Sequence, residues 1–447
     1  MIKFRPPGPR STQLIEKQSK LETRGIVYPR SFPVAWDSGK GATLRDVDGN
    51  IFIDFYAGVG VMNVGHSNPF VLEALESQAR KIVHILDFPN ETKVHFAEKL
   101  LEIAPGKLKD DGVVFFGGPT GSDAIELAIK LAKLNSKRQG IIAFEGGYHG
   151  MTAGALAVTS NRNYKVNYLP LMPEVYRAPY AYCYRCAFGK SYPECDLECA
   201  RYVERLLTDP ESGVTSPAAI LIEATQGEAG VVVPPDGYMS EIRRICDDNN
   251  VIMIVDEIQT GFGRTGKMFC SEHWGVTPDI MTIAKAMGGA GLPAAGAIFR
   301  RTLDIWDPGE SHFGTFRGNA LSSATGLAAI KFMQENKLAE HSETLGAHAL
   351  RRFSDIADRS RTIGQVRGKG LFIGIEIVRN RESKKPWPEL TWEIRKRCFE
   401  RGVIFWSAGH YSNVVRFIPP LVVTRELVDK GIDIFGEVLK DAEHEFL

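Results

Sequence analysis

The stretch VIMIVDEIQTGFGRTGKMFCSEHWGVTPDIMTIAKAMGG, residues 251–289, decides the fold. It contains two short apolar runs, residues 251–255 and 280–284, and each has the length and composition of a strand buried on both faces. The first run ends at Asp256 and the second at Lys285. Ligands of open α/β sheets bind outside the carboxyl ends of the strands. If the two runs are neighbouring strands, Asp256 and Lys285 lie at the same edge of one sheet.

A carboxylate and an amine at the mouth of a parallel sheet have two interpretations. Taken separately, they are the solvated ends of two core strands. Taken together, they are the pair that pyridoxal 5'-phosphate needs. The lysine forms a Schiff base with the cofactor's aldehyde, and the acid keeps the pyridine nitrogen protonated, so that the ring accepts carbanion electrons. The rest of the chain has to decide between the two.

Composition excludes several classes of protein. The chain has 447 residues, 44% apolar and 24% charged, as in an ordinary globular protein of two or three domains. Lys plus Arg equals Asp plus Glu at 54 each, which gives no electrostatic argument for nucleic acid or an anionic membrane as partner. No apolar run approaches ~18 residues, and the polar N-terminus lacks the apolar core of a secretory signal. We therefore expect a cytoplasmic protein.

The pattern of strands and helices changes along the chain. Alternating residues around an Asp-Gly-Asn turn at residues 48–50 predict a β-hairpin. Between residues 113 and 330, strand and helix patterns alternate, which predicts a mostly parallel sheet with helices on both faces. We expect an N-terminal segment that packs with the small domain, a large cofactor-binding domain and a small α+β C-terminal domain, at residues 1–60, 61–335 and 336–447.

Residues 119–123, PTGSD, lie between a predicted strand and the helix that follows. Glycine lets the backbone approach an anion, and the first turn of a helix offers unpaired N–H groups and a positive dipole end. Thr120, Gly121 and Ser122 are therefore candidate phosphate ligands. The same residues also fit an ordinary strand–helix loop in which Thr120 or Ser122 is the N-cap.

A second glycine-rich segment, GFGRTGK at residues 261–267, matches the first seven positions of the NTPase phosphate loop. The next residue is Met268, where that loop carries a Ser or Thr that binds magnesium. We interpret the segment as a charged surface turn and do not expect an NTPase. No GxGxxG motif follows a predicted strand, so a nicotinamide-dependent enzyme lacks support as well.

Three more residues follow predicted strands. Tyr148 and His149 come after the strand GIIAFEGG, where an aromatic ring either stacks on a planar cofactor or is an ordinary loop residue. Glu223 ends the apolar run AAILIE and is a further acid at the carboxyl edge, beside Asp256.

Six motifs in order make the chain resemble the class III (subgroup II) pyridoxal-phosphate-dependent aminotransferases of fold type I, the group of the ornithine, 4-aminobutyrate and acetylornithine aminotransferases. The resemblance extends from Trp36 to the C-terminus. It implies an α/β fold in which a large domain with a mostly parallel central sheet joins a smaller α+β domain. The motifs are TGSDAIELAIKLA, GGYHGMT, VDEIQTGFGRTG, PDIMTIAKAMGGAGLP, FRGNALSSATGLAAI and VRFIPPL.

The resemblance implies a role for each matching residue. Lys285 would form the Schiff base and shuttle protons, and Asp256 would hold the pyridine nitrogen. Thr315 would reach the phosphate bound by the partner subunit, so the working unit would be a homodimer or a larger assembly such as a tetramer. The other cofactor contacts would be Gly121 and Ser122 at the phosphate, Tyr148 with His149 and Ile258 at the ring faces, and Glu223 and Gln259 near the ring hydroxyl.

The resemblance also identifies substrate residues. Arg416 would bind the α-carboxylate through two hydrogen bonds, and Glu228 would pair with that arginine when the substrate carries no α-carboxylate. Relatives that use 2-oxoglutarate or 4-aminobutyrate usually have an arginine where this chain has Met151. Met151 and Val59 together favour a neutral or apolar distal group. The acceptor is then pyruvate, or 2-oxoglutarate held by another residue.

The resemblance implies an aminotransferase with a ping-pong mechanism, and it leaves other outcomes open. An amino-acid racemase of the same family needs only the first half of the chemistry, with reprotonation on the opposite face. Dialkylglycine-type decarboxylases share the HGM triplet but carry glutamine at the place of Val59 and lack the acid at Glu228. A non-catalytic protein of this fold would be expected to have lost Lys285 or Asp256, and both are present.

Four of the seven cysteines lie in an insert at residues 183–199 that is foreign to the family pattern. The spacing is Cys-x2-Cys, eight residues, then Cys-x3-Cys. Three interpretations stay open: a structural zinc site, two disulfides, or four unpaired thiols. The cysteines are Cys183, Cys186, Cys195 and Cys199.

Overall fold

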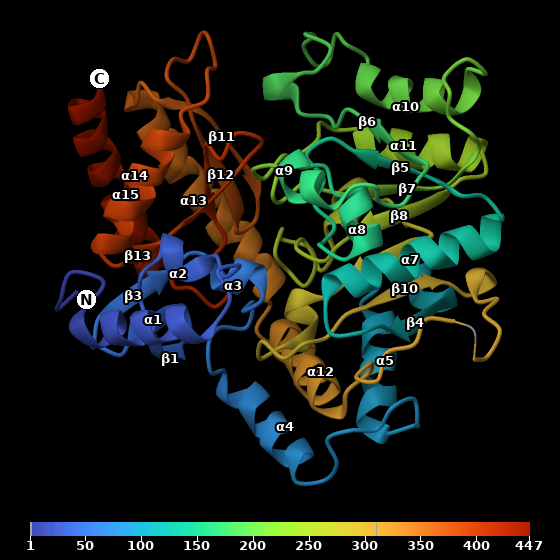
Figure 1. Cartoon of the computed structure of the whole chain (residues 1–447), viewed down its shortest axis with the longest axis horizontal. Helices are drawn as coiled ribbons and strands as arrows, with labels where there is room; N and C mark the ends of the chain where they lie inside the picture. Colours follow the sequence, from blue (N-terminus) through green and yellow to red (C-terminus); the bar gives the residue numbers. More distant parts are fainter. Residues whose placement is uncertain (1, 310) are drawn as a thin grey trace.

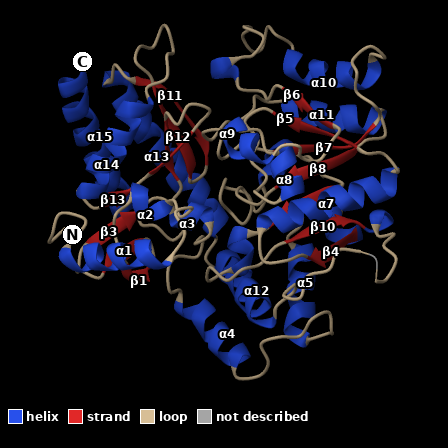
Figure 2. Ribbon diagram, viewed as in Figure 1, coloured by secondary structure: helices blue, strands red, loops and turns tan. Residues whose placement is uncertain are grey.

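The computed structural model describes residues 2–309 and 311–447 and contains three β-sheets (Figures 1 and 2). The largest has seven strands in the order β4-β10-β9-β8-β7-β5-β6. Strand β10 runs antiparallel to both neighbours, and the remaining pairs, from β9 to β6, are parallel. The predicted mostly parallel sheet is thus confirmed. Its strands are β4 (Gly112–Phe116), β5 (Gly140–Phe144), β6 (Val175–Ala178), β7 (Pro217–Glu223), β8 (Ile252–Asp256), β9 (Ile280–Ile283) and β10 (Gly296–Arg300).

Alternate residues of the central strands pack on opposite faces of this sheet, as the pleat requires. Leu221 and Ile254 belong to a buried cluster with α7 (Gly121–Ser136) and α8 (Ala153–Val158). The neighbouring Ile222 and Val255 belong to a second cluster with α10 (Glu198–Thr208) and α11 (Tyr238–Asp248). Because helices cover both faces of the sheet, the central strands are continuous apolar runs in the sequence.

Two four-stranded sheets lie on the other side of the molecule (Figure 2). The hairpin around residues 48–50 is confirmed by the antiparallel pair β2 and β3. Strand β13 pairs in parallel with β3 and so joins the N-terminal and C-terminal segments. The domain limits at residues 60 and 335 stay predictions. The strands are β1 (Trp36–Lys40), β2 (Thr43–Asp46), β3 (Ile51–Asp54) and β13 (Val403–Ile404) in one sheet, and β11 (Ile363–Lys369), β12 (Phe372–Ile377), β15 (Val414–Phe417) and β14 (Trp406–Ala408) in the other.

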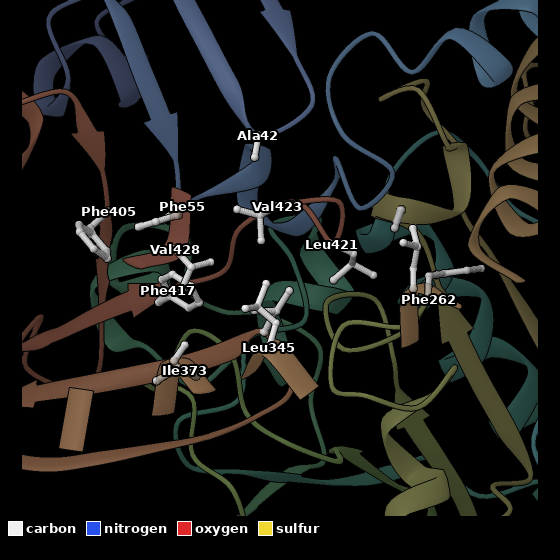
Figure 3. Packing of buried hydrophobic residues seen from close by; sticks show 14 of the residues in the cluster. Ala42, Phe55, Phe262, Leu345, Ile373, Phe405, Phe417, Leu421, Val423 and Val428 are labelled. Atoms are coloured by element: carbon white, nitrogen blue, oxygen red, sulfur yellow. The ribbon is translucent and has the colours of Figure 1, made fainter. Parts of the chain in front are cut away.

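One hydrophobic core joins these segments (Figure 3). Phe55 after β3, Phe262 after β8 and Phe417 on β15 are all fully buried members of it. Among the described residues, no helix is both long and apolar enough to cross a membrane. The remaining helices are α1 (Pro9–Leu21), α2 (Tyr28–Ser31), α3 (Ala57–Gly60), α4 (Pro69–Ala79), α5 (Glu91–Glu102), α6 (Leu108–Asp111), α9 (Arg162–Lys165), α12 (Ala320–Glu335), α13 (Leu338–Arg359), α14 (Pro388–Glu400) and α15 (Arg425–Phe446).

The prediction of a charged surface turn at residues 261–267 is wrong. Arg264 is fully buried, and of this segment only Lys267 is exposed. The Arg264 guanidinium donates to the carbonyl oxygens of Leu371, at 3.2 Å, and Pro419, and to the side-chain oxygen of Asn63. Hydrogen bonds from its two terminal nitrogens offset the cost of burying this charge, and they connect the segment to distant parts of the chain.

The structure contradicts two of the three interpretations of the Cys-rich insert. All four cysteines are free thiols, which excludes the disulfides. In the part of the chain that the structure describes, no group of three or more His, Cys, Asp or Glu side chains is arranged to hold a metal ion, so the zinc prediction is wrong here.

Candidate active site

The carboxyl ends of β7, β8 and β9 bring three charged side chains to one edge of the sheet. In the strand register Glu223 lies beside Asp256, and Asp256 lies beside Thr282, three residues before Lys285. All three charged side chains line one cavity of about 180 Å³. The residues around it are Gly121, Ser122, Tyr148, His149, Gly150, Glu223, Glu228, Asp256, Ile258, Gln259 and Lys285.

Asp256 is almost fully buried and is held by three donors. His149 Nδ1 lies 2.8 Å from Asp256 Oδ2, and the Ile258 N–H and Thr282 hydroxyl donate to Oδ1 at 3.0 and 3.3 Å. His149 is itself buried, and its Nε2 has no hydrogen-bond partner among the described residues. These contacts fix the direction of the carboxylate.

Glu223 is buried next to Asp256, and its pKa is raised. Burial and the nearby Asp256 charge raise the pKa of Glu223 to about 7, against the opposing effect of His149. Its oxygens accept hydrogen bonds from the backbone N–H groups of Tyr148, at 3.0 Å, and Gly227, at 2.9 Å. Near neutral pH Glu223 therefore exists in both protonation states and can donate or accept a hydrogen bond toward the cavity.

Lys285 has an unusual backbone and an unusual amine. Its φ of +51° lies in the left-handed region, which a residue with a side chain adopts at a cost of about 1–3 kcal/mol. Strain of this kind is concentrated at functional sites. Burial lowers the pKa of the Lys285 amine to about 8, because the charged form is poorly solvated in the cavity.

This lowered pKa predicts how the amine of cofactor-free protein captures an aldehyde cofactor. Only the neutral amine attacks, so with a pKa of about 8 the initial capture rate should rise about tenfold between pH 7 and pH 9. The measurement is the growth of visible absorbance after mixing with pyridoxal phosphate. A simple alkyl amine is the control, and its rate should keep rising well above pH 9. A protein midpoint near that of the alkyl amine would contradict the prediction.

The N-terminus of α7 forms one end of the cavity. A Cβ built on Gly121 would lie 3.0 Å from the Ile258 side chain, so a larger residue here would force Ile258 to shift. The Ser122 hydroxyl accepts a hydrogen bond from the Met151 N–H at 3.1 Å. Free N–H groups and the dipole of this 16-residue helix suit a phosphate at this end.

Glu228, which lines the cavity, forms an ion pair with Arg416. Arg416 Nη1 donates to Glu228 Oε1 at 2.6 Å, and the Arg416 side chain is fully buried. Arg416 Nε and Nη2 have no hydrogen-bond partner among the described residues. Burial opposes the charge of Glu228, but Arg416 and Lys285 outweigh it and lower the pKa of Glu228. A buried guanidinium with free donors suits a carboxylate ligand.

Five predicted site residues do not line this cavity, and one of them, Arg416, reaches it only through its pair with Glu228. Thr120 is exposed before α7, and Met151 is 48% exposed. Val59 lines a larger cavity of about 1010 Å³ beside α1, although its carbonyl lies 3.5 Å from Gln259 Nε2. Thr315 lies in a separate hollow with Phe88 and Phe313, both largely exposed.

Two residues of the site escaped the sequence analysis. Thr282 contacts Asp256, and the signal was available, because Thr282 is the one polar residue of the apolar run 280–284. Gly150 lines the cavity with a φ of +126°, and a Cβ there would lie 2.1 Å from the Ser122 hydroxyl oxygen. No local pattern identifies that close approach.

The residues present fit pyridoxal phosphate. A buried amine of lowered pKa, a carboxylate aimed from the next strand and a helix N-terminus surround one cavity. The Tyr148 ring is available beside it as a flat apolar surface, in edge-to-face contact with Tyr164 at 6.0 Å. These groups match the aldehyde, ring nitrogen, phosphate and ring face of the cofactor.

Comparison with known proteins gives the family. Residues 27–439 match the family Aminotransferase class-III. A diaminobutyrate–2-oxoglutarate aminotransferase of Haemophilus influenzae is 39% identical over 436 residues, which cover 96% of this chain and 95% of the relative. An alanine/serine racemase of Pyrococcus horikoshii is 38% identical over 447 residues, covering 98% of this chain and 92% of the relative.

The fold is shared with solved structures. A Bacillus anthracis aminotransferase superposes with a TM-score of 0.89 at 26% identity, covering 97% of this chain and 99% of the other. The chain therefore belongs to the class III aminotransferases and is a pyridoxal-phosphate-dependent enzyme that moves an amino group between an amino acid or amine and a 2-oxo acid.

Proposed function

We propose that this enzyme moves the 4-amino group of 2,4-diaminobutyrate to 2-oxoglutarate. The observation that carries the proposal is the ion pair of Arg416 and Glu228, at 2.6 Å. While the pair is closed, the charge of Arg416 is neutralised, and a donor whose reacting carbon bears no carboxylate is favoured. Carbon 4 of diaminobutyrate is such a carbon. The name of the Haemophilus influenzae relative supports both the donor and the acceptor.

Bound pyridoxal phosphate supplies an aldehyde for the amine and an electron sink for the carbon that loses its proton. In our proposal, Asp256 holds a proton on the ring nitrogen, and His149 fixes the direction of Asp256. Lys285 removes the proton from the substrate carbon and returns it to the cofactor side, for which a pKa of about 8 is suitable. Glu223 provides the hydrogen bond near the ring hydroxyl.

The half-reaction with the 2-oxo acid needs Arg416 to be released from Glu228. Glu228 would leave Arg416 when 2-oxoglutarate arrives. The 2-carboxylate of 2-oxoglutarate would then bind the guanidinium through two hydrogen bonds. Met151 cannot pair with the distal carboxylate, so we propose that another residue holds it.

Racemisation is the second candidate function. It is supported by the Pyrococcus horikoshii relative and by the absence of an arginine at residue 151. It would use Lys285 in the same way, with the proton returned to the opposite face of the same carbon.

Diaminobutyrate labelled with ¹⁵N at one position tests the proposal. With 2-oxoglutarate as acceptor, the 4-labelled donor should give at least about ten times more labelled glutamate than the 2-labelled donor, a difference of about 1.4 kcal/mol between the two barriers. Glu228→Gln should reduce this preference, because Arg416 then stays charged and attracts the carboxylate next to the 2-amino group. Predominant transfer of the 2-amino group, or conversion of L-alanine to the D form without an acceptor, would contradict the proposal.

We also propose that two chains form the working unit, with Thr315 near the phosphate bound by the partner subunit. The largely exposed side chains of Phe88, Phe313 and Phe316 around Thr315 support this, because apolar patches of this kind mark protein interfaces. A cytoplasmic location stays part of the proposal.

A further inference from the structure

We propose that Tyr182, just before the Cys-rich insert, and Arg185, inside it, are positioning residues for Glu228. They act through the buried carboxylate of Glu376 and the guanidinium of Arg367. This inference rests on the proposed function in one respect, since it takes Glu228 as the residue that selects which amino group reacts. It assigns a purpose to an insert that the family pattern lacks.

Glu376, on β12, is the centre of the arrangement. It is fully buried, and its two oxygens are shared between two arginines: Arg185 Nε lies 2.6 Å from Oε1, and Arg367 Nη1 lies 2.6 Å from Oε2. The Tyr182 hydroxyl also donates to Oε2. Burial opposes the charge, but Arg367, Tyr182 and Arg185 outweigh it and lower the pKa of Glu376. The Glu376 carboxylate therefore binds both arginines, and the position of each arginine depends on the other.

Arg367 connects Glu376 to the backbone next to Glu228 through hydrogen bonds. Its Nη2 donates to the Gly230 carbonyl at 2.7 Å, and its Nε donates to the Val231 carbonyl at 3.0 Å. The same Nη2 lies 3.0 Å from the Tyr182 hydroxyl, and the guanidinium lies over the Tyr182 ring at 4.9 Å. A rigid, planar guanidinium can hold all these partners only in one orientation.

The segment that carries Glu228, residues 226–232, is tightly folded and is here called the gate segment. Its ends pair through the backbones of Gln226 and Val232. Gly230 has a φ of +104°, and a Cβ there would lie 2.7 Å from the Val414 side chain. The Glu228 carbonyl accepts from the Gly409 N–H at 2.9 Å. Because the segment is this compact, a displacement at residues 230–231 reaches Glu228.

Loss of Arg185 therefore has a specific consequence. Glu376 loses one of its two cations, and Arg367 can move toward the freed oxygen and away from the Gly230 carbonyl. Glu228 then spends less time on Arg416, and the open arginine attracts the carboxylate beside the 2-amino group. A displacement of about 1 Å is enough to change rates by one to two orders of magnitude. A merely structural role would lower both transfers in proportion and leave their ratio unchanged.

The variants are Arg185→Met and Tyr182→Phe in the holoenzyme. Arg185 is partly exposed, at 17% of its side chain, so its replacement is expected to fold, unlike a change at the fully buried Glu376. Arg201→Met is the matched control, because this arginine, just after the insert on α10, forms its ion pairs with the insert acids Asp196 and Glu198. Arg185→Lys should restore part of the wild-type behaviour, because it keeps a cation beside Glu376.

Two readouts are needed. With ¹⁵N-labelled diaminobutyrate, Arg185→Met should reduce the ratio of 4-amino to 2-amino transfer about tenfold, with the summed rate within about threefold of wild type. Hydrogen exchange at residues 226–232 should be faster in Arg185→Met and Tyr182→Phe, and unchanged in Arg201→Met. Unchanged exchange in both Arg185→Met and Tyr182→Phe would overturn the inference, and so would an unchanged ratio in a wild type that prefers the 4-amino group. If wild type itself shows no preference for the 4-amino group, the proposed function is wrong. Hydrogen exchange at residues 226–232 then still tests whether Tyr182 and Arg185 position Glu228.

Discussion

Lys285→Ala is expected to reduce the amino-transfer rate by at least about 10³-fold, since the variant loses both the amine that binds the aldehyde and the base that moves the proton. The visible absorbance of the lysine-bound cofactor should disappear as well. Lys285 lines the cavity, its pKa is lowered to about 8, and it lies at the end of the strand next to Asp256. No other lysine lines this cavity in the described chain.

The control for this variant is Lys267→Ala. Lys267 ends the GFGRTGK segment and is exposed, so its removal should leave rate and absorbance unchanged. The measurements are absorbance spectra of the cofactor-supplemented proteins and the rate of glutamate formation from 2-oxoglutarate. An undiminished visible band in Lys285→Ala would show that another amine holds the cofactor, and the assignment of Lys285 would then be abandoned.

The fold and the centre of the site could be predicted because they depend on local patterns. Residues 251–255 and 280–284 are apolar runs of strand length, and parallel strands place their carboxyl ends together. The polar residue after each run then falls at the cavity without any knowledge of tertiary contacts. The same argument places Glu223 beside Asp256, as the register of β7 and β8 shows.

Contacts between distant segments were beyond local patterns. Arg264 looks like a surface cation in GFGRTGK, yet its partners Asn63 and Pro419 lie more than 150 residues away on either side. Arg185 and Glu376 are separated by 191 residues. Nothing near either residue in the sequence indicates its partner, so local patterns do not reveal this buried network.

The zinc and disulfide interpretations of the cysteine spacing failed for a related reason. Spacing reports which thiols can approach one another, whereas metal binding also needs converging directions and ionised sulfur. The first residues of the insert are fixed instead by Tyr182 and Arg185 on Glu376, an anchor that the cysteine pattern does not contain.

Asp256→Asn is expected to lower the amino-transfer rate by about 10²–10³-fold, with cofactor still bound. The amide has almost the same shape, so the His149 and Ile258 contacts can adjust, but it carries no negative charge. Without that charge the ring nitrogen loses its proton more readily, and the ring becomes a poorer electron sink. The rate per bound cofactor is the quantity to measure, together with the melting temperature.

Asp279→Asn separates this effect from the mere loss of a buried carboxylate. Asp279 is equally buried and pairs with Arg243 at 3.0 Å and Arg300 at 2.9 Å, but it precedes β9 and so lies at the opposite edge of the sheet from Lys285. Its replacement should lower the melting temperature and leave the rate per bound cofactor unchanged. A cofactor analogue methylated on the ring nitrogen carries a permanent positive charge, so it should restore part of the rate in Asp256→Asn. If the analogue restores nothing, the carboxylate acts through geometry alone, and the electrostatic account of Asp256 is wrong.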